Sequence, residues 1–147
     1  MRVQKESFDA SAEATALTHG RSDIGAVDTF TGHCRDDGGA LAALEIEHYP
    51  GMAEDEINRV ACEAAARWPI EGIVAIHRYG LIRPGEPIVL AVTASTHRGE
   101  AFAAASFLMD YLKTEAPFWK KQHLSASGGD WVEAKAEDDA AAQKWRG

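Results

Sequence analysis

The chain has 147 residues, of which 46% are hydrophobic and 26% are charged. This length and composition are typical of one globular domain rather than of a disordered segment. With 15 Lys and Arg against 23 Asp and Glu the net charge is −8 at pH 7, which argues against nucleic-acid binding, because such binding depends on neutralising phosphates. The two cysteines form no C-x-x-C pair, no secretion signal opens the chain, and no apolar run is long enough to span a bilayer. We therefore expect a cytoplasmic protein with neither a disulfide scaffold nor a membrane segment.

The first half of the chain predicts a strand, a short helix and two further strands. These elements are expected over residues 2–8, 10–17, 25–32 and 41–49. Asp9 is suited to cap the helix, because its carboxylate can accept a hydrogen bond from a backbone N–H of the first turn. A turn signal of Asp and Gly residues separates the last two strands, so we expect those strands to pair as an antiparallel hairpin.

The second half predicts two long helices that alternate with strands. The helices are expected over 52–68 and 98–115, with strands over 72–77 and 87–93 between them. Steps of three and four residues place the apolar side chains of each helix on one face. These side chains are Ile57, Val60, Ala61, Ala64 and Trp68 in the first helix, and Ala101, Ala104, Ala105, Leu108 and Leu112 in the second.

Pro117 prevents the second long helix from continuing, and the residues after it predict an extended segment. A polar tail over about 136–147 closes the chain. We therefore expect one α+β domain, spanning residues 1–147, with a mixed and largely antiparallel sheet.

Three short segments concentrate residues that can bind an anion. His97 and Arg98 stand where a helix begins, and an anion there would be stabilised by the free N–H groups and the helix dipole. The alternative is a solvated arginine beside a capping threonine. Lys113 lies near the end of the same helix, where it can simply complement the dipole. Lys120 and Lys121 follow in an extended stretch, so they face opposite ways and one of them can face a pocket.

The third segment is His33-Cys34-Arg35, at the end of a strand. A catalytic Cys34 is disfavoured, because its chain neighbour His33 points to the opposite face and cannot serve as its base. The spacing of His48, His77 and His97 matches no metal-binding pattern, so we expect no metal site. The residues alone thus predict an α+β domain with an anion pocket of Arg and Lys.

Longer motifs in the chain resemble those of a known family, the large, catalytic subunit of molybdopterin synthase. EHYPGM and MDYLKT-x-APFWK are the most specific of them. The matching stretches keep the family's order and are 25–32 (GAVDTFTG), 44–52 (LEIEHYPGM), 67–69 (RWP), 76–78 (IHR), 96–98 (THR), 109–120 (MDYLKTEAPFWK) and 130–134 (DWVEA).

The resemblance implies an α/β hammerhead fold and a homodimer. It also implies a heterotetramer with two copies of a small ubiquitin-like sulfur-carrier subunit, whose Gly-Gly terminus carries a thiocarboxylate. The reaction it implies transfers two sulfurs to cyclic pyranopterin monophosphate to make molybdopterin. The sulfur arrives already activated, so no metal, nucleotide or redox cofactor is expected. Two alternatives stay open, namely a non-catalytic module that docks a ubiquitin-like tail and another enzyme that binds phosphate esters.

The resemblance also assigns site residues, with Lys113 and Lys120 as the catalytic pair. The substrate-binding residues it implies are His33, Cys34, Arg35, His97, Arg98, Lys113, Lys120, Lys121 and Gln122. The chain departs from the family at His33, where a longer residue such as lysine is common, and at Lys135, where arginine is common. If the second long helix is straight, Arg98 and Lys113 lie roughly 22 Å apart, so we expect a site shared between two subunits of a dimer.

Overall fold

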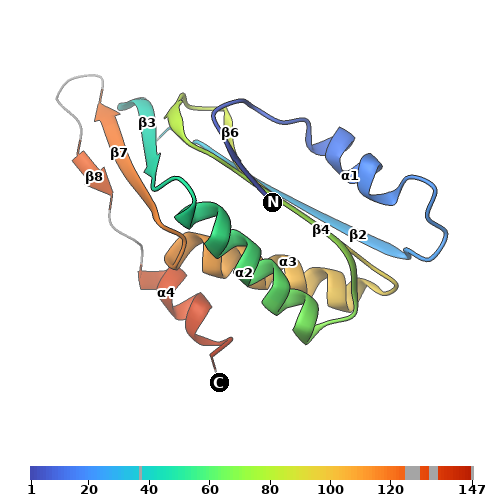
Figure 1. Cartoon of the computed structure of the whole chain (residues 1–147). Coiled ribbons are helices and arrows are strands. Elements are labelled where there is room, and N and C mark those ends of the chain that lie inside the picture. Colours follow the sequence, from blue (N-terminus) through green and yellow to red (C-terminus); the bar gives the residue numbers. More distant parts are fainter. Residues whose placement is uncertain (37, 125–129, 133–135, 147) are drawn as a thin grey trace.

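The computed structural model describes residues 1–36, 38–124, 130–132 and 136–146. Within these residues the chain forms two four-stranded sheets and four helices, so the α+β prediction is confirmed (Figure 1). In chain order the elements are β1 (Arg2–Gln4), α1 (Ala10–Thr18), β2 (Ala26–His33), β3 (Leu41–His48), α2 (Met52–Arg67), β4 (Ile70–Arg78), β5 (Gly80–Ile82), β6 (Pro87–Ser95), α3 (Arg98–Thr114), β7 (Phe118–Leu124), β8 (Asp130–Val132) and α4 (Ala136–Gln143).

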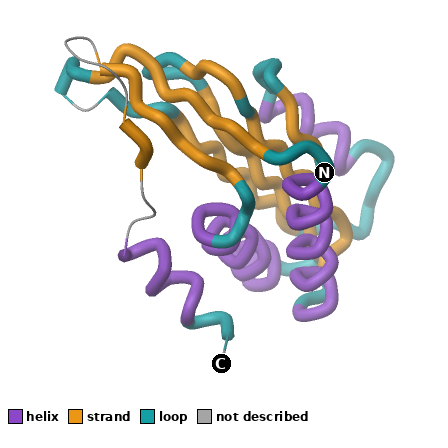
Figure 2. The backbone as a smooth tube through the Cα atoms, turned by 60° about the vertical axis from the view of Figure 1, so that its left-hand side comes forward, coloured by secondary structure: helices purple, strands orange, loops and turns teal. Residues whose placement is uncertain are grey.

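The first sheet has the strand order β1-β4-β6-β2 and forms the centre of the molecule. β6 pairs antiparallel with β2 and with β4, and β1 runs parallel to β4. Helix α1 covers one face, while α2 and α3 lie side by side on the other (Figures 1 and 2). Because successive strand side chains alternate between faces, Ile76 and Leu90 pack toward α1 and Ile73 packs toward α2 and α3.

The second sheet has the order β5-β3-β7-β8, and it corrects the predicted hairpin. The strands at 25–32 and 41–49 do not pair, because β2 pairs with β6 while β3 pairs with β5 and β7. The backbone N–H of Cys34 donates a 2.8 Å hydrogen bond to the carbonyl oxygen of Glu86, and the N–H of Gly85 donates a 2.7 Å hydrogen bond to that of Cys34. These bonds hold the chain beside the β5–β6 turn as it passes from one sheet to the other. A turn signal shows where a chain bends, but not which strand it then meets.

The long helices form where the apolar stripes predict them. Asp9 caps α1 by accepting a 3.0 Å hydrogen bond from the N–H of Ala12. Four of the five predicted apolar residues of α2 are buried, and Trp68 packs at the edge of the same core. All five of α3 are buried, and the alanines among them let α3 approach the sheet closely. No helix within the described residues is long and apolar enough to cross a membrane.

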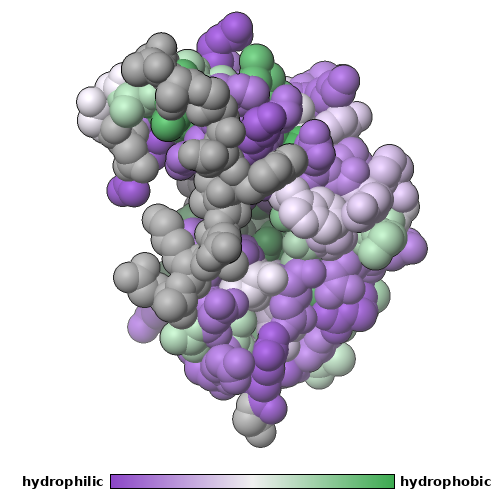
Figure 3. Space-filling view, turned by 90° about the vertical axis from the view of Figure 1, so that its left-hand side faces the viewer, coloured by the Kyte–Doolittle hydropathy of each residue, from purple (hydrophilic) through white to green (hydrophobic). Residues whose placement is uncertain are grey.

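The predicted polar tail contains helix α4, and Trp145, which follows it, is anchored in the core. Trp145 meets Trp68 and Phe107 edge-on, with ring centroids 5.6 and 5.7 Å apart, and its indole N–H donates a 2.5 Å hydrogen bond to Asp110. Tertiary contact rather than helical periodicity therefore holds this segment on α3. Figure 3, which looks from the β7–β8 and α4 side, shows a mainly hydrophilic face with small, separate hydrophobic areas.

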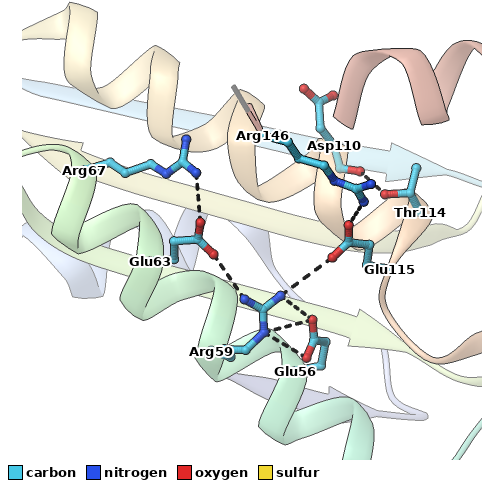
Figure 4. Close-up of polar contacts among 8 residues, drawn as sticks. All are labelled: Glu56, Arg59, Glu63, Arg67, Asp110, Thr114, Glu115 and Arg146. Atoms are coloured by element: carbon cyan, nitrogen blue, oxygen red, sulfur yellow. Dashed lines mark hydrogen bonds and ion pairs between the residues drawn. The ribbon is translucent and has the colours of Figure 1, made fainter. Parts of the chain in front are cut away.

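A network of ion pairs fixes the end of α3 (Figure 4). Arg59 on α2 donates to Glu63 at 3.1 Å and lies 3.7 Å from Glu115, which also pairs with Arg146. These side chains are partly exposed, and each such pair contributes only about 0–1 kcal/mol. Their combined effect is positional, because Glu115 stands two residues before Pro117, at the bend that leads from α3 into β7.

Candidate functional site

A cavity of about 170 Å³ lies where α3 and β7 meet the first sheet. Its lining is Phe30, Gly32, His33, His77, Ile88, Val89, Met109, Leu112, Lys113 and Lys120. A second hollow of about 470 Å³, between β2 and α3, shares Phe30, Met109 and Lys113 with it. Together the two hollows reach the size of typical small-molecule pockets, roughly 300–1,000 Å³.

Lys113 and Lys120 reach this cavity from different elements. Lys113 stands in the last turn of α3, with its side chain 48% exposed and its ammonium nitrogen 3.5 Å from an Asp138 oxygen. Lys120 comes from β7, which returns past the cavity because Pro117 turns the chain after α3. Lys121 faces the other way, as strand alternation predicts, and lies opposite Glu45 in the register of β3 and β7. The structure thus places Lys120, rather than Lys121, in the cavity wall.

Part of the cavity wall is apolar, and Ile88, Val89 and Leu112 are among the residues that form it. Strands β2 and β6 also approach each other closely at this wall. A Cβ atom at Gly32 would lie 2.7 Å from a Val89 methyl carbon, so a larger residue there would push Val89 out of place. The arrangement can hold an organic ring system against the apolar surface, with two ammonium groups beside it to meet negative charge.

His77 is a cavity residue that the sequence analysis did not assign. It is 5% exposed, and its ring stacks on Phe118 with centroids 3.7 Å apart. Burial, together with the nearby positive charge of Lys120, lowers the pKa of His77 to about 4, so the ring is neutral at neutral pH. The guanidinium of the next residue, Arg78, donates hydrogen bonds to the backbone oxygens of Lys5 and Pro87. These bonds give Arg78 a structural role. The only sequence signal was the IHR motif at the end of an apolar strand.

The predicted cluster His33-Cys34-Arg35 is divided in the structure. His33 lines the cavity, whereas Arg35 is exposed and is not part of the lining. Cys34 is 3% exposed and packs in the core, with its sulfur 3.9 Å from the Ile82 carbonyl oxygen. Burial, with the negative charges of Glu86 and Asp36, raises the pKa of the Cys34 thiol. The thiol is therefore a core group, and a substrate-binding role for Cys34 stays a prediction.

The remaining predicted residues lie outside this cavity. His97 and Arg98 are exposed at the start of α3, while Lys113 stands in its last turn, so a single subunit does not bring the two groups together. Gln122 follows Lys120 by two residues on β7, so its side chain is on the same face of the strand but further along the chain from α3. Lys135 lies outside the described residues. A substrate role for each of these residues stays a prediction.

Comparison with known proteins decides the family. The family model described as MoaE protein matches residues 3–115. The molybdopterin synthase catalytic subunit of Mesorhizobium japonicum is 61% identical over 99% of this chain and 92% of its own length. This chain belongs to the MoaE family. The predicted identity as an enzyme of molybdenum cofactor biosynthesis, of the molybdopterin synthase catalytic-subunit type, is thereby confirmed.

Solved structures agree with this assignment. The MoaE protein of Burkholderia ambifaria matches with a TM-score of 0.84 and 46% identity, covering 99% of this chain and 97% of that one. A chain from a Helicobacter pylori complex of subunits 1 and 2 of molybdopterin-converting factor has the same fold, with a TM-score of 0.71 at 19% identity, covering 92% of this chain and 90% of that one. The mixed fold is therefore that of the MoaE proteins.

Proposed function

We propose that this MoaE chain transfers sulfur from the C-terminal thiocarboxylate of a small ubiquitin-like carrier to cyclic pyranopterin monophosphate, twice per molybdopterin. The observation that carries the proposal is the convergence of Lys113 and Lys120 on one partly apolar cavity. Both the precursor and the carrier terminus are anionic, and two ammonium groups attract such ligands even on a chain whose net charge is −8. The apolar wall suits the flat pterin ring.

The larger hollow supplies a route for the carrier terminus. It is lined by residues of β2 and α3 and shares Lys113 with the cavity. A Gly-Gly tail is narrow enough to lie in such a channel, and its thiocarboxylate would then meet the ammonium group of Lys113. The Helicobacter pylori fold neighbour was itself solved as a two-subunit complex. These points support a heterotetramer of two MoaE chains and two carriers.

The chemistry then needs fixed cations rather than a resident cofactor. The thiocarboxylate sulfur forms a bond to a carbon of the precursor, and a carbon–oxygen bond of that precursor breaks. Negative charge develops on the departing oxygen, including that of the cyclic phosphate as it opens. Lys113 and Lys120 are already in place to stabilise this charge, so little reorganisation is needed during the reaction. The carrier remains joined to the pterin by an acyl–sulfur bond, which water must cleave before the next carrier enters.

We infer that His97 and Arg98, which the resemblance lists as substrate-binding, hold the phosphate of the precursor, and this role requires a second subunit. These residues stand at the opposite end of α3 from Lys113, roughly 22 Å away for a 15-residue separation, which is too far for one small pterin to span. We propose a homodimer in which His97 and Arg98 of one subunit complete the pocket formed by Lys113 and Lys120 of the other. Two-fold symmetry would then give two equivalent pockets.

Separate measurements of binding and turnover distinguish this enzyme from a module that only docks a carrier tail. Lys113→Ala should bind the carrier within a few-fold of the wild-type affinity by calorimetry, but should lose nearly all molybdopterin formation with thiocarboxylated carrier and precursor. Lys144→Ala is a matched control, since that lysine is also exposed and pairs with an aspartate, but lies outside the cavity. If the wild type binds the carrier but forms no molybdopterin from thiocarboxylated carrier and precursor, the docking module is favoured.

A further inference from the structure

The ring of His77 is held in one place in the wall of the cavity. It stacks nearly parallel on Phe118, with planes inclined by 13°. Phe118 and Lys120 are two residues apart on β7, so their side chains lie on the same face of that strand. Both His77 and Lys120 line the cavity. The imidazole is therefore fixed beside the lysine and close to the place where the acyl–sulfur bond would form.

A hydrogen bond settles which ring nitrogen carries the proton. The Nδ1 atom of His77 lies 2.8 Å from the carbonyl oxygen of Arg78. A carbonyl oxygen only accepts hydrogen bonds, so Nδ1 is the protonated nitrogen and Nε2 of the neutral ring keeps its lone pair. The bond to Arg78 engages Nδ1 alone, so Nε2 is the nitrogen of the ring that can accept a proton. His77 thus presents a basic nitrogen to its surroundings.

Nε2 of His77 differs from the other polar groups of the cavity because it is both buried and able to accept a proton. Lys120 from β7, Lys113 from α3 and His33 from β2 line the same cavity. His48 from β3 packs on Phe118 and, like Lys120, acts to lower the pKa of His77. An ammonium group has no lone pair, so the charged lysines can donate but not accept. His77, unlike the exposed His33, is also shielded from bulk water. Negative charge arriving with substrate would raise the pKa of His77 toward the range of an effective base.

We propose that His77 is the general base for the water that cleaves the acyl–sulfur bond and releases the spent carrier, an inference that rests on the proposed function. Nε2 takes a proton from the water as the water oxygen bonds to the acyl carbon. The carbon–sulfur bond then breaks, and the departing pterin sulfur receives the proton from Nε2. The carrier leaves as a carboxylic acid, which ionises. The pterin keeps the sulfur, and no atom is oxidised or reduced.

A single-turnover experiment separates the two steps. Enzyme, thiocarboxylated carrier and cyclic pyranopterin monophosphate are mixed and quenched at intervals, and the intact mass of the carrier is followed. We expect His77→Gln to form the carrier–pterin adduct within a few-fold of the wild-type rate. Its breakdown should slow about 10²–10⁴-fold, the usual contribution of general acid–base catalysis, so the adduct should accumulate.

His48→Gln is the matched control for this experiment. The His48 ring packs 4.2 Å from Tyr79 and 6.2 Å from Phe118 but does not line the cavity. Both steps should keep near wild-type rates in this variant. Thermal melting of both variants establishes whether the fold is retained. A structural role for His77 would slow adduct formation and breakdown alike, and that result would overturn the proposal.

The remaining outcomes are also decisive. If the wild type forms neither adduct nor molybdopterin, the proposed function fails. If the wild type is active and His77→Gln cleaves the adduct at the wild-type rate, only the role of His77 fails. If His77→Gln does not fold, nitrogen NMR of the labelled wild-type protein replaces the kinetic test. At neutral pH the His77 proton should be on Nδ1, and a proton on Nε2 would refute the assignment.

Discussion

Neighbouring lysines of β7 give a direct test of the pocket, because the strand points them in opposite directions. Lys120 lines the cavity, while Lys121 lies opposite Glu45 on the β3 side of the sheet register. We expect Lys120→Ala to lower the rate of molybdopterin formation about 10²–10³-fold. That magnitude corresponds to about 2.7–4 kcal/mol, the usual cost of removing one fixed group that stabilises developing charge. Lys121→Ala should stay within a few-fold of the wild type.

The two variants also control for one another. Both lysines are partly exposed at adjacent positions of one strand, and a surface substitution of this kind changes the free energy of unfolding by about 0.5 kcal/mol or less. Thermal melting should therefore show similar stability for both, while a reconstituted turnover assay separates them. Equal losses of activity at both positions would refute the assignment of the two side chains to opposite faces of β7. Full activity of Lys120→Ala would refute the role of Lys120 in the reaction.

Three further predictions follow from burial and from the separation of the site residues. His77 is the first. Its pKa is lowered from 6.5 to about 4, so the unfolded chain binds more protons in that window, and stability should decline as pH falls from about 6.5 toward 4. The total is at most about 3 kcal/mol. Denaturant titrations should show this dependence reduced in His77→Gln, and an equal dependence in both proteins would contradict it. Second, Arg35→Ala and Arg98→Ala should weaken binding of the phosphate-bearing precursor in calorimetry and leave carrier binding nearly unchanged; loss of carrier binding alone would overturn that assignment. Third, mixing inactive Lys113→Ala and Arg98→Ala subunits should restore about one good pocket per mixed dimer, and no recovery after confirmed subunit exchange would contradict the shared site.

The long helices could be predicted because their signals are local. Apolar residues recur at helical spacing along α2 and α3, and each helix ends near a proline. The pairing of strands could not be predicted in the same way. β2 meets β6, which lies far along the chain, and the turn after β2 gives no information about that partner. β5 has only three residues, too few to display a pattern, and α4 is polar apart from a few anchoring residues such as Ala142.

The candidate site divides in the same manner. The resemblance pointed to His33, Lys113 and Lys120, and the structure brings these three to one cavity. His77 was missed because a histidine in a buried strand carries no sequence pattern that separates a structural from a functional ring. Its significance depends on Phe118, which packs against it from another sheet. The proposed contact of Arg98 with the pocket needs a second subunit, which the sequence of one chain cannot position.

The most direct test of sulfur transfer at this cavity is reconstitution with purified components. Wild-type protein is mixed with thiocarboxylated carrier and cyclic pyranopterin monophosphate, and molybdopterin and spent carrier are quantified together. The proposed function predicts molybdopterin as the product, with two carriers converted from thiocarboxylate to carboxylate for each pterin. Tight binding of both ligands without any molybdopterin, while a homologous synthase makes it under the same conditions, would contradict the central claim.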